Sequence, residues 1–301
     1  MYLDKFHKTS GEFAPADMRE LAALVAATSA TLAEPLSALE RPDPGPGPVE
    51  FLELAFTRID MAGALDAIVS RLPSAPFAYV VTPNVDHVVR LQRRRSDLWP
   101  AYRGAWMTLC DSRILAKMAR AVGQDLPVVT GSDLTAALFD HHIDRNDRVA
   151  ILGGSEEMVA RIAARYGLCD LHHYNPPMGF IRDPREVTRA VRFLASTKAR
   201  YVFLAVGSPQ QEIIARRLAR AGAACGIGFC VGAGLEFLTG DQERAPRLMQ
   251  QMSLEWLYRL GSDPQRLWRR YLIDGPQIFR IHQTWRRMTL GLQNAAGGLT
   301  P

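Results

Sequence analysis

Short apolar runs alternate with longer stretches of mixed polarity from Phe51 onward. The runs FAYVVT, VAILGG, RYVFLAVG and ACGIGFCVGAG are strand-like, and an amphipathic stretch with helical spacing follows each of them. Strands that are apolar on both faces are typical of a parallel sheet that is covered by helices. The pattern therefore predicts an α/β fold with a Rossmann-like, mostly parallel sheet flanked by helices.

The two ends of the chain differ from this pattern. LERPDPGPGPVE, at positions 39–50, alternates Pro and Gly and supports neither helix nor sheet, so residues 1–50 are predicted to be an N-terminal appendage and linker. Residues 51–240 are predicted to form the Rossmann-like sheet domain. After Gly240 the pattern changes to helices rich in Arg, which predicts a basic helical C-terminal appendage over residues 241–301.

Composition and charge narrow the class of protein. With 301 residues, 48% hydrophobic and 22% charged, the chain can bury one large core or two smaller ones. A net charge of +5 and a pI near 9.2 favour an anionic partner, but do not distinguish nucleic acid from a nucleotide-sugar or anionic lipid. The four cysteines form no CxxC pair, which favours reduced thiols in the cytosol. We expect no transmembrane segment, and any membrane contact to be peripheral.

Four strand-to-helix turns carry polar or glycine residues, namely VTPNVDH, LCDSRIL, LGGSEEM and VGSPQQE. In a doubly wound sheet such turns share one edge, so they are predicted to line a common crevice. In the second turn, Asp111 is either a general base or a simple helix N-cap. In the first turn, Thr82 and Asn84 are either hydrogen-bonding partners for a sugar or phosphate, or ordinary turn residues.

The other two turns supply further candidates for substrate binding. Gly153 and Gly154 permit close approach of the backbone to a phosphate. Gln211 and Glu212 stand at the carboxyl end of a strand, where ligands bind in such sheets, although Glu212 could instead stabilise the start of its helix. GIGFCVGAG does not match GxGxxG with a following acidic residue, and neither DxD nor HExxH occurs. The sequence therefore predicts neither a cofactor nor a metal site.

Three arginines of the C-terminal region, Arg259, Arg266 and Arg269, are spaced by two helical turns and then one. A continuous helix would align them, although Pro264 lies between the first two. Guanidinium groups suit a diphosphate, so these residues are candidates for a clamp. The alternative, which is more common for a run of charges, is a solvated basic face.

Taken together, TPNVDHVV, CDSRIL followed by VTGSDL, ILGGSEE, VGSPQQE, CVGAG, RAP and LEWLYRLGSDPQRLWRRY resemble the WecG/TagA/CpsF family of glycosyltransferases, over about residues 51–279. The resemblance implies inverting, metal-independent transfer of a sugar from a UDP-sugar to a polyprenyl-diphosphate-linked sugar. It places the reaction in the cytoplasm, with the enzyme peripheral on the inner face of a bacterial membrane.

The resemblance also assigns residues. It implies Asp111 as the base, with pocket positions at Thr82, Asn84 and Gln211, and basic appendage positions at Arg259, Arg266 and Arg269. The chain departs from the family where CDS replaces a common PDG, and where Val128 and Val129 replace an Arg, so one pocket contact differs.

The implied partners are a UDP-sugar donor, a lipid-linked sugar acceptor and an anionic membrane surface, without nucleic acid, and a homo-oligomer is also allowed. Two alternatives remain open from the residues alone. One is an NAD-dependent oxidoreductase on the same class of fold. The other is a non-catalytic module that binds nucleic acid or anionic membrane through the basic C-terminal region.

Overall fold

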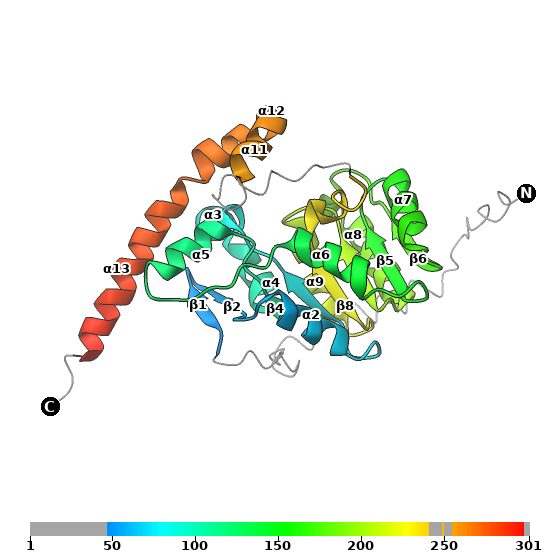
Figure 1. Cartoon of the computed structure of the whole chain (residues 1–301), viewed down its shortest axis with the longest axis horizontal. Coiled ribbons are helices and arrows are strands. Elements are labelled where there is room, and N and C mark those ends of the chain that lie inside the picture. Colours follow the sequence, from blue (N-terminus) through cyan, green and yellow to red (C-terminus); the bar gives the residue numbers. More distant parts are fainter. Residues whose placement is uncertain (1–46, 241–248, 250–254, 298–301) are drawn as a thin grey trace, which may run out of the picture. The chain divides into compact units, whose positions relative to one another are not determined.

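The computed structural model describes residues 47–240, 249 and 255–297 (Figure 1). Its centre is a six-stranded sheet in the order β4-β3-β8-β7-β5-β6, in which every pairing is parallel. The strands are β3 (Ala78–Val81), β4 (Met107–Thr108), β5 (Arg148–Leu152), β6 (Asp170–Tyr174), β7 (Tyr201–Leu204) and β8 (Ile227–Cys230). A separate antiparallel pair, β1 (Val49–Phe51) and β2 (Leu54–Phe56), precedes them.

Helices connect successive strands of the sheet. The α-helices up to β8 are α2 (Met61–Ser70), α3 (Val85–Arg93), α4 (Trp99–Arg103), α5 (Arg113–Arg120), α6 (Gly131–His141), α7 (Glu156–Tyr166), α8 (Pro184–Thr197) and α9 (Gln210–Ala221). Short 3-10 turns are η1 (Ser96–Leu98), η2 (Phe180–Arg182) and η3 (Gly232–Leu235).

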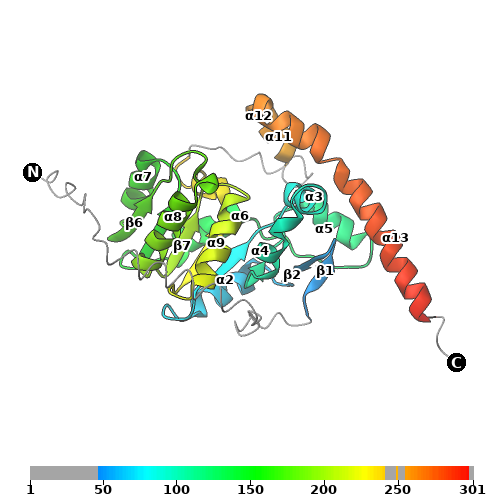
Figure 2. The same ribbon diagram turned by 180° about the vertical axis from the view of Figure 1, so that it is seen from behind.

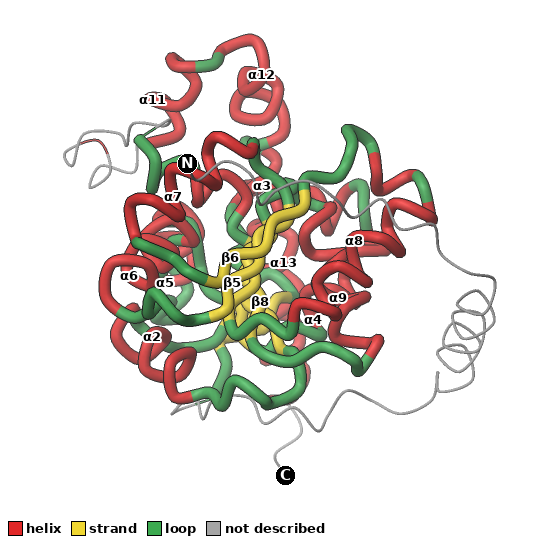
Figure 3. Tube along the Cα trace, turned by 90° about the vertical axis from the view of Figure 1, so that its right-hand side faces the viewer, coloured by secondary structure: helices red, strands yellow, loops and turns green. Residues whose placement is uncertain are grey.

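Alternate residues of each strand bury opposite faces of the sheet. Tyr79 and Val81 of β3 pack in one core with α3, α4, α8 and α9, whereas Ala78 and Val80 pack in a second core with α2, α6 and α7. Figure 3 shows the strands between these two layers of helices. The result is a three-layer α/β fold with a parallel sheet, which confirms the predicted fold class. The four apolar runs correspond to β3, β5, β7 and β8.

The C-terminal region is helical, as expected, and consists of α11 (Glu255–Ser262), α12 (Pro264–Trp268), the π-helical segment η4 (Arg269–Asp274) and α13 (Gln277–Gly297). Views from the two sides show α13 running past α3 and the β1–β2 pair (Figures 1 and 2).

This last helix is anchored in the core of the sheet domain. Ile278 and Ile281 are buried in the same cluster as Phe51, and the Trp285 ring lies edge-on to Phe51 with centroids 5.2 Å apart. Arg94, at the end of α3, donates to an Asp274 carboxylate oxygen at 2.6 Å. The boundary predicted after residue 50 falls inside β1. Of the predicted appendage and linker, which covers residues 1–50, residues 1–46 lie outside the described residues.

Candidate active site

A pocket of about 420 Å³ lies where β3 and β4 end. Four segments that are distant in sequence line it: the turn before α3, the turn before α5, the segment before α6, and residues 270–279 of the C-terminal region. The lining residues used below are Asn84, Asp86, Asp111, Thr130, Arg270 and Tyr271. The first two of these segments belong to the four turns that were predicted to share a crevice, VTPNVDH and LCDSRIL, whereas no residue of LGGSEEM or VGSPQQE lines this pocket.

Three of the helices that begin at this pocket have a polar N-cap residue in its lining. Asn84, Ser112 and Thr130 are the N-caps of α3, α5 and α6, and each side-chain oxygen accepts a hydrogen bond from a backbone N–H of its own helix. All three residues line the pocket. Because the N-terminal end of a helix carries partial positive charge, three such ends favour an anionic ligand here.

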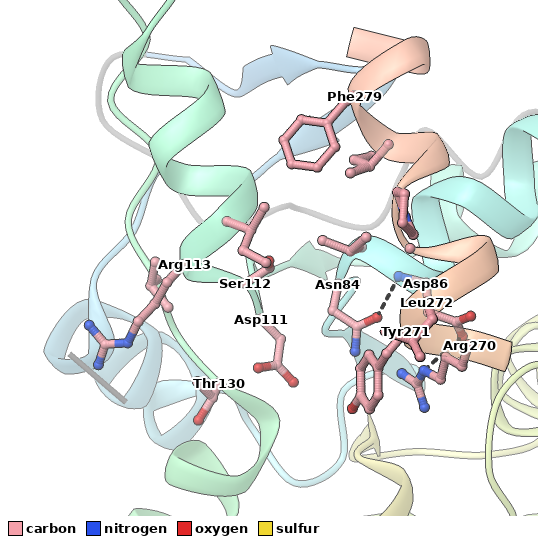
Figure 4. A pocket seen from close by; sticks show the side chains of 16 residues that line it. Asn84, Asp86, Asp111, Ser112, Arg113, Thr130, Arg270, Tyr271, Leu272 and Phe279 are labelled. Atoms are coloured by element: carbon pink, nitrogen blue, oxygen red, sulfur yellow. Dashed lines mark hydrogen bonds and ion pairs between the residues drawn. The ribbon is translucent and has the colours of Figure 1, made fainter. Parts of the chain in front are cut away.

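Asp111 is held against the turn after β3. Its backbone N–H donates to the Pro83 carbonyl at 3.1 Å, and Cys110 next to it forms a parallel bridge with Val128. Figure 4 shows the Asp111 carboxylate pointing into the pocket between Thr130 and Asn84. The cap of α5 is Ser112, whose hydroxyl accepts from Leu115 at 3.2 Å. The alternative in which Asp111 simply caps this helix therefore does not describe the structure.

Three of the predicted site residues are buried and do not line the pocket, namely Thr82, Gln211 and Glu212. The Thr82 hydroxyl donates to the Cys230 carbonyl at 3.4 Å. Gln211 accepts from the Gly232 N–H at 2.8 Å through Oε1 and donates to Glu212 at 3.0 Å through Nε2. Their expected contacts with substrate stay a prediction, since in this arrangement all three side chains are buried.

A chain of polar contacts runs from the pocket to the loop before α9. Asp86, which lines the pocket, pairs with Arg90, and Arg90 donates to the Ser208 hydroxyl at 2.8 Å. Burial raises the pKa of the Glu212 carboxyl above its ordinary value of 4.5. Burial likewise lowers the pKa of His87 to about 3. Burial therefore favours the neutral form of the Glu212 carboxyl and of the His87 imidazole.

Gly153 and Gly154 follow β5, which β8 and β7 separate from β3, and they do not line this pocket. Gly153 has φ +93°, and an added Cβ would lie 2.8 Å from the Ala205 carbonyl oxygen. Its N–H donates to the Tyr174 carbonyl at 2.8 Å. These contacts account for a glycine at position 153 without any ligand. A role of Gly153 and Gly154 in phosphate binding stays a prediction.

The arginine of the C-terminal region that lines the pocket is not among the three that the helical spacing favoured. Arg269 is exposed and does not line the pocket, whereas Arg270 does, with Nε 3.7 Å from an Asp86 carboxylate oxygen and Cζ 5.6 Å from the Tyr271 ring centroid (Figure 4). The side chains of Arg259 and Arg266 lie outside those that the structure describes, so their expected roles stay predictions.

Sequence reasoning also missed Thr130. A signal existed, because Thr130 followed three residues later by Asp133 is the pattern of a helix N-terminus, and the Asp133 N–H donates to the Thr130 hydroxyl at 3.1 Å. Val128, at a position where the resemblance leads one to expect Arg, is part of the pocket wall.

Two searches of the described ranges concern metals and membranes. Among these residues, no group of three or more His, Cys, Asp or Glu side chains is arranged to hold a metal ion. No helix within the described ranges combines the length and the apolar character that crossing a bilayer requires.

Comparison with known proteins gives the identity of the family. The model of the "Glycosyl transferase WecG/TagA/CpsF family" matches residues 49–290. The N-acetylglucosaminyldiphosphoundecaprenol N-acetyl-beta-D-mannosaminyltransferase of Bacillus spizizenii is 28% identical over 204 residues, which are 65% of this chain and 75% of that protein. Because the family match covers most of the sequence and agrees with the fold and the order of the motifs, the chain belongs to the WecG/TagA/CpsF family of glycosyltransferases.

Proposed function

We propose that this glycosyltransferase moves an N-acetylhexosamine from a UDP-sugar to a sugar linked to polyprenyl diphosphate, with inversion at the anomeric carbon. The observation that carries the proposal is the convergence of three helix N-termini and the Asp111 carboxylate in one pocket. The arrangement suits a diphosphate beside a base. The activity for which the Bacillus relative is named supports the lipid-linked acceptor and the class of the transferred sugar.

In the proposed reaction, the Asp111 carboxylate removes the proton from an acceptor hydroxyl. The hydroxyl oxygen then forms a bond to the anomeric carbon while the bond from that carbon to the UDP oxygen breaks. UDP leaves with the electron pair, and attack from the opposite side inverts the configuration. A carboxylate positioned within the pocket is suited to this step, because the hydroxyl becomes acidic only as the new bond forms.

Positive charge for the leaving diphosphate comes from the protein itself in this proposal. Arg270 presents a guanidinium group at the pocket, and α3, α5 and α6 present their N-terminal ends. Fixed donors of this kind can stabilise developing negative charge, a role that a metal ion has in other enzymes. We therefore propose that transfer is metal-independent.

We also propose that the enzyme works peripherally on the inner face of a bacterial membrane, where a lipid-linked acceptor and a cytoplasmic nucleotide-sugar can meet. This placement is supported by the exposed basic side chains of α13, among them Arg280, Arg286 and Arg287. Such side chains attract anionic headgroups.

The test is release of UDP by the purified full chain. UDP-N-acetylhexosamines are supplied singly, with and without an N-acetylglucosaminyl diphosphate that carries a short prenyl chain. We expect acceptor-dependent release that persists in EDTA. Release that needs no acceptor would contradict transfer, and activity that EDTA abolishes and Mn²⁺ restores would contradict the metal-free mechanism. Oxidation or reduction of NAD(H) in place of UDP release would favour the oxidoreductase alternative.

A further inference from the structure

The pocket has two chemically different ends. Asn84, Asp111 and Thr130 form its polar end, whereas Phe279 stands on the opposite side, on the first turn of α13 (Figure 4). The other apolar residues that line the pocket include Ile114, Leu272 and Ile278. Exposed apolar side chains that lie together often mark a binding groove, and this wall offers no polar partner to a sugar or a diphosphate, so it suits an apolar part of a ligand.

This apolar end is open to solvent and firmly attached to the fold. Phe279 is 62% exposed and Leu272 is 55% exposed, although both line the pocket. Ile278, the residue before Phe279, is 1% exposed. It belongs to the hydrophobic core cluster that also contains residues of α3. The exposed side chains of Phe279 and Leu272 therefore stand on a segment that the buried Ile278 attaches to the core, as a binding surface requires.

The order of groups around the pocket matches the order of groups in the proposed acceptor. That molecule has a sugar, then a diphosphate, then an apolar chain. In the pocket, the Asp111 carboxylate lies at the polar end, and Arg270 and Leu272 stand two residues apart on the segment that leads to Phe279 at the apolar end (Figure 4). We propose that Leu272, Ile278 and Phe279, with Ile114, form a subsite for the first isoprene units of the acceptor lipid. This inference rests on the proposed function.

The subsite is distinct from general attraction of the C-terminal region to a membrane. A membrane contact would use any exposed apolar side chain of α13. The subsite uses only those that line the pocket. Met288 provides the matched comparison, because it lies on the same helix and is 63% exposed but does not line the pocket.

The experiment measures kcat/KM for two water-soluble acceptors in the absence of vesicles. Both carry N-acetylglucosaminyl diphosphate, one esterified to two isoprene units and the other to a methyl group. The wild-type enzyme is expected to favour the prenyl acceptor at least tenfold. Phe279→Ala should lower this preference about tenfold, equivalent to about 1.4 kcal/mol of transition-state binding. Leu272→Ala should lower it in the same direction, and Met288→Ala should leave it within about twofold of wild type.

The outcomes separate this subsite from the proposed function. An active enzyme without preference for the prenyl acceptor would overturn the subsite and leave the transferase reaction standing. Equal losses of preference in Phe279→Ala and Met288→Ala would also overturn it. Absence of UDP release with either acceptor, for a folded wild-type protein and every UDP-sugar tried, would overturn the proposed function and the subsite together.

Discussion

At the scale of single residues, the neighbours Asp111 and Ser112 have different roles at the turn before α5. The Ser112 hydroxyl caps α5, while the Asp111 carboxylate points into the pocket. Asp111→Asn keeps the size of the side chain and removes the base. We expect normal folding and a loss of about 10²–10⁴ in kcat, which is the usual contribution of a positioned general base. Initial rates of UDP release at saturating substrates check this.

The control for this variant is Asp125→Asn, because Asp125 is an exposed aspartate outside the pocket, 4.0 Å from Arg120. It should retain activity within about twofold. Turnover of Asp111→Asn near the wild-type level would remove Asp111 from the mechanism.

Adjacent arginines offer a second comparison at this scale. Arg270 lines the pocket and Arg269 is exposed outside it. Hydrogen bonds to charged groups contribute about 1.5–3 kcal/mol, so Arg270→Ala should lower kcat/KM by roughly 10- to 100-fold. Arg269→Ala should have a clearly smaller effect. A larger loss in Arg269→Ala, measured with the same soluble acceptor, would restore the assignment made from helical spacing.

At the scale of elements, the difference between these arginines has a physical cause. The spacing argument assumes a regular α-helix, in which residues three, four and seven apart share a face. From Arg269 to Asp274 the chain is π-helical, with more residues in each turn. The α-helical spacing therefore does not continue beyond Arg269, and it is Arg270 that lines the pocket. Nothing in the residue pattern marks this change.

The strands show what the sequence could and could not predict. Apolar runs identified β3, β5, β7 and β8 because these strands are buried on both faces. The edge strand β6 was not predicted, because its sequence, DLHHY, is half-buried along its length and has no apolar run. The β1–β2 hairpin turns at Leu52 and Glu53, both with positive φ, without the Asn-Gly or Asp-Gly signal of such turns.

The start of α9 supports a prediction about pH. The raised pKa of Glu212 means that the folded state holds the carboxyl proton more tightly than the unfolded chain. This contribution to stability is fully present below the ordinary pKa of 4.5 and is lost as pH rises from there through the folded pKa. Glu212→Gln, which cannot ionise, should remove this loss. Its free energy of unfolding should therefore fall less than that of wild type as pH rises from 4.5.

Denaturant unfolding at a series of pH values measures this difference. Glu156→Gln is the matched control, because Glu156 is also in the first turn of a helix, α7, but is exposed. It should follow the wild-type curve. If Glu212→Gln kept the full wild-type decline with pH, the carboxyl would not be the group responsible.

At the scale of the whole molecule, the positive charge is unevenly distributed along the chain. Residues 255–297 contain seven arginines and three acidic residues, a balance of +4 within a total of +5. On α13 the exposed arginines stand on a helix whose Ile278, Ile281 and Trp285 pack against the sheet domain. Binding of α13 to a membrane would therefore bring the rest of the protein with it.

Attachment to anionic vesicles tests whether this local charge, rather than the net charge, is responsible. The double variant Arg286→Ala, Arg287→Ala removes two exposed cations from α13. At about 1 kcal/mol for each cation near an anionic surface, vesicle affinity should fall roughly 30-fold at low salt, and less at high salt. Arg217→Ala with Arg220→Ala, on the exposed side of α9, lowers the net charge by the same amount and should change affinity much less. Equal losses in the two double variants, measured by co-sedimentation, would show that net charge alone drives attachment and that α13 has no special part in it.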